Sequence, residues 1–410
     1  MTPEVRDRIE QIRHGNVPEG YVKSDAGIIP ASWQCKSIGS SLRIKNNERK
    51  PISEEVRQTI PGPYPYYGPT QAQGYISTYE SEGPAVLIGE DGDHFLKYKS
   101  KPMTLWVDGK YTVNNHAHMI CGTEICNARW FYYVYEFKPL LNAITRQGAG
   151  RYKLTKDALE KLPIQLPSSV EQKQISEILT TQDKVIELKE KRLAEKQRQK
   201  KHLMQQLLTG KKRLPGFSGE WQKIAVGAFI HEVDEKTTEN NQYDILSVTK
   251  NGIVRQSDHF NKQIASEDNT GYKILRRGNL AFSSMNLWMG SLDVLEDYEI
   301  GIISPAYKVF SFNTKLMDIK FGKQFMRSEP MIWQYKVNSE QGASIVRRNL
   351  DLKALLSTKV SIPNINEQQA IAAVFVAADK EIELLRQDLE QEKQKKKALM
   401  QLLLTGIVRV

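Results

Sequence analysis

Two histidines and two cysteines lie close together in the chain, at His116, His118, Cys121 and Cys126. On a β-strand, a His-x-His pair points both imidazoles to one face, and imidazole and thiolate groups are zinc ligands. The spacing of these four residues nevertheless matches no standard zinc module. We therefore predict no metal site, and expect the residues to pack within a strand or to lie at a binding surface.

Three further patterns bear on catalysis. Glu187-Leu188-Lys189 and Asp351-Leu352-Lys353 have the carboxylate–lysine order of some nucleases, but we interpret both as structural. The chain has no Pro-Pro dipeptide, and so no Asn-Pro-Pro-Tyr motif of the kind that holds a target base in methyltransferases. Gly210-Lys211-Lys212 lacks the upstream glycine and the hydroxyl residue of a phosphate-binding GxxxxGK[ST] loop. We predict no catalytic residue and no enzyme activity.

Basic residues are concentrated in one tract. The chain of 410 residues has a formal net charge of +10, and between Lys184 and Arg213 eleven Lys and Arg stand against three Glu, a local charge of +8. Such a tract is typical of nucleic-acid binding, although a solvated helix face would carry the same charges. The corresponding tract from Asp379 to Arg409 has seven basic and six acidic residues, or +1.

The composition describes a globular protein of two or more domains, with 40% hydrophobic and 26% charged residues. No stretch approaches the roughly 20 apolar residues of a membrane helix, and we read no signal peptide at the N-terminus. Three cysteines without CxxC spacing suit a reducing compartment. We expect a cytoplasmic protein with no membrane association.

One segment occurs twice, at residues 167–210 and 363–406. The copies are 196 residues apart without a gap, and 19 of 44 aligned positions are identical. Each copy follows a proline and stops at Thr-Gly, which predicts two long helices with glycine stops. At 1.5 Å per residue, each helix would be roughly 60 Å long. A fixed long period indicates two structural units that form a pair.

Apolar residues in both copies follow a heptad spacing that a lysine interrupts, Lys200 in the first and Lys396 in the second. This pattern predicts a coiled-coil seam between two charged, antiparallel helices with pseudo-twofold symmetry. We expect the helices to bind partner subunits as well, and the predicted partner-binding residues are Ile175, Leu179, Ile186, Leu193, Leu203, Leu207, Ile371, Phe375, Ile382, Leu389, Leu399 and Leu403.

The intervening globular segments begin and end alike but share little interior sequence. Each begins with a turn and a tryptophan, Trp33 or Trp221, which we assign to the core. Short predicted strands include 85–88, 111–113, 245–248 and 307–310. The predicted fold is α+β, with two β-rich globular domains (1–166 and 214–362) separated by two long helices (167–213 and 363–410). Alike helices with unlike globular parts suggest a common frame that carries two different reading heads.

The whole chain resembles the specificity subunit of type I restriction–modification enzymes. The resemblance rests on the duplicated Glu-Gln-x-x-Ile…Leu-Leu-Thr-Gly helices and on the phrases 27–33 (GIIPASW) and 213–221 (RLPGFSGEW). Within the globular segments, residues 86–92, 113–118 and 301–307 look like parts of target-recognition domains.

This resemblance implies a non-catalytic subunit that reads a split sequence in double-stranded DNA, one half with each recognition domain. It implies that the helices space the two halves and hold two methyltransferase subunits, and that two ATP-dependent restriction and translocase subunits join them. S-adenosylmethionine, ATP and Mg²⁺ would belong to those partners, and this chain would bind no cofactor.

Contacts to bases and phosphates require amides, guanidinium groups, aromatic rings and small polar groups, and the resemblance directs the search to both globular segments. In the first segment the predicted contacts are Tyr64, Tyr66, Tyr67, Gln71, Asp91, Asp93, Asn115, His116, His118, Arg146, Arg151 and Lys153. Gln73 lies in the same cluster as the first four of these. In the second segment the predicted contacts are Thr249, Asn251, Arg255, Gln256, Ser284, Asn286, Trp288, Tyr307, Arg347 and Arg348.

Two matters stay open at this level. We expect the Lys196–Arg213 end to face phosphates or an acidic partner, so that neutralising Lys200, Lys201, Lys211 and Lys212 would flatten the salt dependence of DNA binding. The alternatives to the main interpretation are a recognition subunit of a methylation-only system and a coiled-coil scaffold with two peptide-binding domains.

Overall fold

The computed structural model describes residues 2–147, 151–249, 252–259, 266–341 and 348–410, and the chain divides into two compact units. Unit 1 comprises residues 1–190 and 388–410, and unit 2 comprises residues 191–387. Each unit combines one globular segment with parts of both long helices. Among the described residues, no helix is long and apolar enough to cross a membrane.

The repeated segments form two helices of 39 residues each, α6 (Ser169–Leu207) and α12 (Ile365–Leu403). After each helix the glycine of the Thr-Gly pair has a left-handed backbone, with φ of 68° at Gly210 and 69° at Gly406. Glycine adopts this conformation without steric cost, which makes it the usual residue at a helix end. The predicted helices and their glycine stops are confirmed.

Unit 1 contains two four-stranded sheets, ordered β6-β5-β10-β7 and β4-β11-β8-β9, and the two-stranded pairs β1-β2, β12-β13 and β14-β3. Besides its part of α6, its α-helices are α1 (Pro3–Arg13), α2 (Ile38–Ser41), α3 (Glu54–Thr59), α4 (Ala128–Tyr135) and α5 (Lys156–Lys161). Its strands are β1 (Tyr21–Ser24), β2 (Gly27–Pro30), β3 (Gln34–Ser37), β4 (Arg43–Ile44), β5 (Pro61–Tyr67), β6 (Ala72–Ile76), β7 (Ser81–Glu82), β8 (Ala85–Gly89), β9 (Thr104–Val107), β10 (Lys110–Val113), β11 (Ala117–Cys121), β12 (Thr145–Gln147), β13 (Arg151–Lys153) and β14 (Pro163–Leu166).

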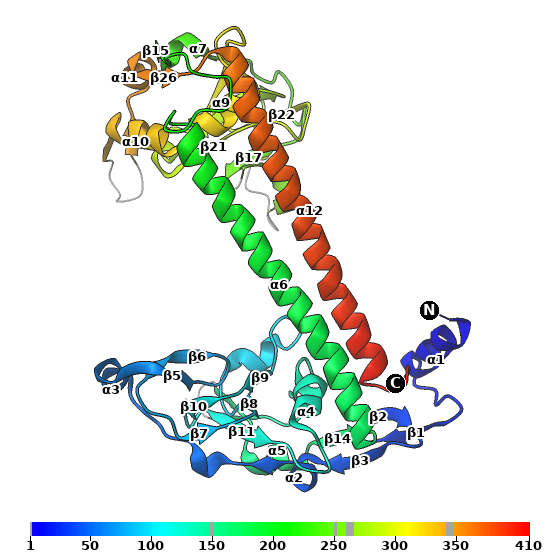
Figure 1. Cartoon of the computed structure of the whole chain (residues 1–410). Coiled ribbons are helices and arrows are strands. Elements are labelled where there is room, and N and C mark those ends of the chain that lie inside the picture. Colours follow the sequence, from blue (N-terminus) through cyan, green and yellow to red (C-terminus); the bar gives the residue numbers. More distant parts are fainter. Residues whose placement is uncertain (1, 148–150, 250–251, 260–265, 342–347) are drawn as a thin grey trace. The chain divides into compact units, whose positions relative to one another are not determined.

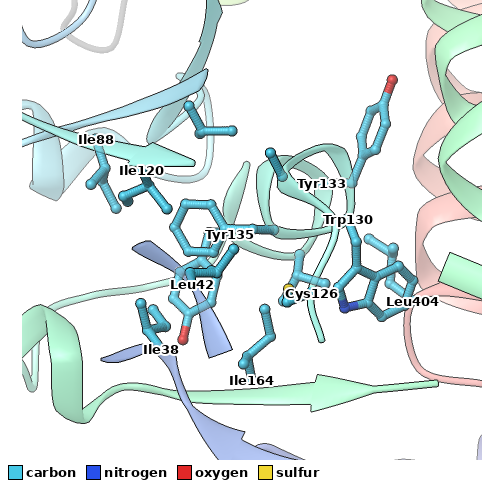
Figure 2. Packing of buried hydrophobic residues seen from close by; sticks show 14 of the residues in the cluster. Ile38, Leu42, Ile88, Ile120, Cys126, Trp130, Tyr133, Tyr135, Ile164 and Leu404 are labelled. Atoms are coloured by element: carbon cyan, nitrogen blue, oxygen red, sulfur yellow. The ribbon is translucent and has the colours of Figure 1, made fainter. Parts of the chain in front are cut away.

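The strand β8 buries side chains on both of its faces, since successive residues of a strand point in opposite directions. One face belongs to the main core, where Ile88 and Ile120 of the sheet lie near Tyr135 of α4, while Trp130 of the same helix lies beside Leu404 (Figure 2). Leu404, just after α12, lies in the same core beside α4. The end of the second helix is therefore part of the hydrophobic core of unit 1.

Unit 2 contains one four-stranded sheet, ordered β16-β23-β20-β21, and the pairs β15-β26, β17-β18, β19-β22 and β24-β25. Its shorter α-helices are α7 (Val226–Phe229), α8 (Gln256–His259), α9 (Ile319–Met326), α10 (Glu329–Val337) and α11 (Leu352–Ser357). Its strands are β15 (Gln222–Ala225), β16 (Ile230–Glu232), β17 (Leu246–Thr249), β18 (Gly252–Arg255), β19 (Lys273–Arg276), β20 (Leu280–Ser283), β21 (Leu292–Val294), β22 (Ile300–Ile303), β23 (Tyr307–Phe312), β24 (Ser339–Gln341), β25 (Arg348–Leu350) and β26 (Lys359–Ile362).

The two units share the order of their main elements, although their interior sequences differ and unit 1 has a second four-stranded sheet of β5, β6, β7 and β10 (Figure 1). The antiparallel sheet β4-β11-β8-β9 corresponds to β16-β23-β20-β21, the closing pair β14-β3 to β26-β15, and the hairpin β12-β13 to β24-β25. The central registers also agree, because Ala117 faces Gly89 in unit 1 and Tyr307 faces Ser283 in unit 2. A common frame with unlike interiors is therefore present, as the sequence indicates.

The apolar residues of the repeated helices lie inside the units. Leu203 and Leu399 are half-buried against the cores, as are Ile186 and Leu193 in the helix pair. The buried members are Ile175, Leu179, Leu207, Ile371, Phe375, Ile382, Leu389 and Leu403. Because the chain itself encloses these eight side chains, we correct the expectation that they are contact points for partner subunits.

The lysine that interrupts each heptad pattern forms an ion pair with the other helix. In unit 2, Lys200 Nζ lies 2.5 Å from Asp379 Oδ1, and in unit 1, Lys396 Nζ lies 2.8 Å from Asp183 Oδ1. Asp183 and Asp379 are equivalent residues of the two copies, so the same pair forms twice. The pairing requires antiparallel helices within each unit, which confirms that prediction.

A second reciprocal pair joins the start of one copy to the residue beyond the end of the other. In unit 1, Arg409 donates to Glu171 through Nε at 2.5 Å and Nη2 at 2.7 Å. In unit 2, Arg213 donates to Glu367 in the same bidentate way, at 2.5 and 2.6 Å. Both glutamates are buried, and each also begins a helix, where negative charge is favourable.

The glutamine of the Glu-Gln motif ties the helix start to a neighbouring loop. Gln172 accepts a hydrogen bond from the Asn127 amide and donates to the carbonyl of the preceding proline, while Gln368 does the same with the Asp318 amide and its own proline. Asn127 and Asp318 in turn cap α4 and α9. The repeated motif therefore positions an equivalent helix in each unit.

The predicted core tryptophans differ in burial. Trp33 is buried in the core of unit 1 and meets Trp130 edge to face at 5.7 Å between ring centroids, as its assignment to the core predicts. Trp221 is only half-buried, packed against the core of unit 2 beneath the Arg213 guanidinium.

We predict that Lys396→Met destabilises the chain, and more at pH 7 than at pH 5. Lys396 lies 2.8 Å from the carboxylate of Glu136, whose side chain is 6% exposed. Burial raises the pKa of Glu136, and the charge of Lys396 partly offsets this. When the pKa of a carboxyl group is higher in the folded chain than in the unfolded chain, the folded chain loses stability as the pH rises through the folded pKa. Removal of Lys396 raises the folded pKa of Glu136 further, so that this loss of stability continues to higher pH.

The expected loss at pH 7 is roughly 3–5 kcal/mol, because a buried carboxylate would lose its partner. Urea denaturation of the full chain at both pH values measures it. The second substitution of Glu136→Gln should return most of the stability, since it removes the uncompensated charge. An equal loss at both pH values, or a double variant no more stable than the single one, would contradict this assignment.

Candidate nucleic-acid interface

Three connections at one edge of unit 1, together with the start of β13, surround a hollow of about 370 Å³. The connections are the β5–β6 turn with the start of β6, the segment between β8 and Phe95, and the β10–β11 turn. The hollow is lined by Pro69, Gln73, Asp91, Gly92, Asp93, His116 and Arg151. Four of these are predicted contacts, brought together from three separate parts of the sequence.

Asn114 holds the turns of the hollow in place. It is buried, and its backbone amide donates to the Tyr67 carbonyl at 2.9 Å. Its side chain donates to Gln73 Oε1 at 3.2 Å and accepts from the His116 amide at 2.8 Å. One amide side chain thus fixes two turns, and the polar groups around the hollow are positioned before any ligand arrives.

The charged groups of the hollow are paired only in part. His116 Nδ1 lies 2.9 Å from Asp91 Oδ2, which orients both side chains. Asp93 and Arg151 are exposed. A carboxylate accepts hydrogen bonds from base amino groups, and a guanidinium donates to guanine or to phosphate oxygens. The hollow therefore presents both acceptors and donors suited to the edges of base pairs.

The remaining predicted residues of unit 1 lie around the hollow to different extents. Gln71 and Asn115 are exposed in the turns that line it, and Arg146 is exposed on β12. Lys153 on β13 lies 3.5 Å from Glu90, which also accepts from Arg49. Tyr64 is half-buried against Tyr79, and Tyr67, whose pKa burial raises, is half-buried against Tyr111.

Two predicted contacts in unit 1 require correction. The Tyr66 ring is buried, and its hydroxyl accepts from the Ile52 amide at 2.9 Å and donates to the Lys50 carbonyl at 3.2 Å. His118 is also buried: Nδ1 lies 2.9 Å from the side-chain amide of Asn46, and Nε2 lies 2.8 Å from the Leu154 carbonyl. Burial lowers the pKa of His118, which favours the neutral ring. Neither residue is placed to contact DNA.

The predicted residues of unit 2 at the β17–β18 hairpin are partly engaged with the chain. Arg255 forms an ion pair with Asp244 at 2.9 Å and lies over the Tyr298 ring. Gln256 donates to Ser247 Oγ at 2.8 Å, and Thr249 donates to the Gly252 carbonyl at 3.0 Å. These bonds hold the hairpin together, so the three residues have a structural role in this structure.

A second group in unit 2 surrounds the segment after β20. Ser284, Asn286 and Trp288 follow this strand, and the Arg348 amide donates to the Met285 carbonyl at 3.2 Å. The Arg348 guanidinium donates to Ser339 and lies 5.8 Å from the centroid of the Trp288 ring. Tyr307, at the start of β23, is half-buried, and burial raises its pKa.

Two residues near these sites were not predicted from the sequence, and two predicted contacts lie outside the described residues. Arg49, which orders Glu90 behind the hollow, and Met289, which is exposed beside Trp288, carried no motif that could have identified them. The predicted contacts Asn251 and Arg347 lie outside the described residues.

Four basic residues of the tract form ion pairs within the chain. Lys196 and Lys200 pair with Glu381 and Asp379, and Arg213 pairs with Glu367. In unit 1, Lys189 pairs with Asp388 and Glu392. Basic residues of α6 therefore attract acidic residues of α12. Because Lys200 is one of these paired residues, we correct the expectation that it faces phosphates. Lys201, Lys211 and Lys212 are exposed and remain suited to a phosphate backbone.

Comparisons with known proteins agree with this arrangement. The family model for the type I restriction modification DNA specificity domain matches residues 30–197. A Haemophilus influenzae protein assigned as a type I restriction enzyme specificity subunit is 37% identical over 149 residues, which is 36% of each chain. The MjaVIII specificity subunit of Methanocaldococcus jannaschii is 21% identical over 93% of this chain and 94% of its own length.

Among solved structures, the S subunit of the type I restriction–modification system of M. genitalium has a TM-score of 0.57 and 12% identity. The match covers 90% of this chain and 96% of that one, and it shows a common fold. The domain model and the curated relatives agree with the duplicated helices and the two β-rich units: residues 30–197 match the type I restriction modification DNA specificity domain, and the chain is similar along most of its length to type I restriction enzyme specificity subunits.

Proposed function

We propose that this chain reads a two-part DNA target, one part with each unit, and carries the methyltransferase and restriction subunits of its system. The observation that supports this most directly is the equivalent strand order of the main sheet, the closing pair and the hairpin in both units, combined with different side chains at the equivalent edges. A frame used twice with unlike edges suits the reading of two unlike half-sites. The chain itself supplies no catalysis in this proposal.

The partners in this proposal are two copies of an adenine methyltransferase subunit and two copies of an ATP-dependent restriction and translocase subunit. S-adenosylmethionine, ATP and Mg²⁺ would then bind to those subunits. The presence of two units with the same frame supports an even number of partners, since each frame can hold one copy in the same way.

One pair of exposed residues supports two identical docking sites. Leu188 on α6 and Leu384 on α12 occupy the same position of the repeat, and they are 65% and 56% exposed. Each follows an exposed lysine, Lys184 or Lys380, one helical turn earlier. The chain encloses the other repeated leucines to a much greater extent, whereas Leu188 and Leu384 add nothing to the cores. We therefore assign it to a partner surface that occurs once in each unit.

Mapping of methylated adenines in a host with and without this gene tests the proposal. We expect one split, asymmetric motif to lose its methylation when the gene is deleted. Substitution of unit 1 or unit 2 by the corresponding unit of another specificity subunit should change only one half of the motif. A methylation pattern that does not depend on this gene would overturn the proposal.

The docking sites give a stoichiometric prediction. Leu188→Ser and Leu384→Ser should each reduce the number of bound methyltransferase subunits from two to one, and the double variant should bind none, because each substitution removes one apolar anchor. Native mass spectrometry of the purified complex measures the count. Val376→Ser is the matched control, since Val376 is exposed on α12 but its repeat counterpart is Thr180. Two subunits bound to the double variant would refute the assignment.

The corrected residue set predicts opposite effects of two substitutions in unit 1. Arg151→Gln should weaken DNA binding of the assembled complex about tenfold without loss of stability, because the exposed guanidinium contacts DNA directly. Tyr66→Phe should leave that affinity unchanged and lower the free energy of unfolding by about 1–2 kcal/mol, because two buried backbone groups lose their partner. DNA titrations and urea denaturation distinguish the outcomes, and a reversed pattern would refute the placement.

A further inference from the structure

The equivalent registers of the two sheets allow the reading edges to be compared residue by residue. Gly89 ends β8 opposite Ala117, and Ser283 ends β20 opposite Tyr307. Two residues beyond these strand ends, Asp91 of unit 1 therefore corresponds to Met285 of unit 2. Both residues also meet the hairpin that precedes β14 or β26, Asp91 by a β-bridge and Met285 through its carbonyl.

The edge of unit 1 is acidic at this position. Asp91 and Asp93 line the hollow together with His116 and Arg151. His116 engages one oxygen of Asp91, which leaves the other oxygen available, and Asp93 is exposed. Carboxylates are repelled by DNA phosphates, so two of them at a DNA-facing edge are favourable only where they accept hydrogen bonds from bases.

Bases offer such donors only as amino groups. In the major groove these are cytosine N4 and adenine N6, whereas guanine O6 and N7 and thymine O4 are acceptors that a carboxylate repels. An aspartate at this edge therefore attracts one kind of base edge and rejects the other. This rejection makes it a determinant of specificity rather than of affinity alone.

The edge of unit 2 is apolar at the equivalent position. Met285 is 37% exposed and Met289 is 45% exposed, on either side of Trp288. The Arg348 guanidinium covers the Trp288 ring and is bonded to Ser339, so it belongs to the scaffold of this edge. The sulfur of a flexible, polarisable thioether is only a weak acceptor for a base amino group, but the side chain packs well on the methyl group of thymine.

We propose that the two units read chemically different base edges: unit 1 selects an exocyclic amino group through Asp91 and Asp93, and unit 2 selects a thymine methyl group through Met285 and Met289. The inference rests on the proposed DNA-reading function and names its chemistry. It also assigns Asp93, the more exposed carboxylate, as the residue that excludes guanine and thymine at one position of its half-site.

The test compares base preference at every position of the target for complexes that contain this chain or a variant. In Asp93→Asn, the amide can donate as well as accept, so that guanine and thymine are no longer repelled. We expect discrimination at one position of one half-site to fall about ten- to hundredfold, with the other half unchanged. Asp91→Asn should act at the same or the neighbouring position. Met285→Gln and Met289→Gln should relax a thymine preference in the opposite half-site only.

Asp157→Asn is the matched control, because Asp157 is an exposed aspartate of unit 1 on α5 that does not line the hollow. Its complex should read the wild-type sequence. If Asp93→Asn and Asp91→Asn retain wild-type base preference at every position, the inference fails while the DNA-reading function stands. If the wild-type complex itself shows no sequence preference, the proposed function fails first. A uniform change of affinity across all sequences would also overturn the inference, because it would assign the carboxylates to the phosphate backbone.

Discussion

The structure depends on the antiparallel pairing of two copies of one helix through charged groups. The seam contains lysines where a continuous coiled coil would have apolar residues, and each lysine meets the aspartate of the other copy, as Lys200 does with Asp379 and Lys396 with Asp183. A parallel arrangement would leave these charges without partners, which costs most for Lys396, whose side chain is 13% exposed, and less for Asp379, whose side chain is 49% exposed. The direction of the helices is thus set by electrostatics as much as by hydrophobic burial.

The same pairing makes the repeated motif serve both units. The glutamate that starts α6 binds the arginine beyond α12, and the glutamate that starts α12 binds the arginine beyond α6. Each unit is therefore closed by residues from both copies, and the hydrophobic core of unit 1 includes Leu404 from the far end of the sequence. Residues 388–410 have no separate domain of their own and complete unit 1.

On this frame, the reading edges are free to differ. The strands β8 and β20 end in the same register, and the segments that follow them carry carboxylates in one unit and thioethers in the other. Because these segments are exposed and are held by only a few bonds behind them, such as those of Asn114, their side chains can change without loss of the core. The shared strands fix where the exposed turns lie, and the side chains of these turns determine which groups they can contact.

The sequence by itself determined the repeated helices, their glycine stops, their antiparallel pairing and the resemblance to type I specificity subunits, because a repeat at a fixed period and a heptad pattern can be seen without knowledge of distant contacts. It also located most of the segments of the unit 1 hollow, since Asp91, Asp93, His116 and Arg151 all lie there. Only the tertiary structure decided which neighbouring residues face outward. Tyr66 and His118 lie one or two residues from exposed or half-exposed positions, yet the partners that enclose them come from elsewhere in the chain. The basic tract was misjudged for the same reason, because the acids that neutralise Lys196 and Lys200 lie about 180 residues further along the sequence and meet them only after the helices pair.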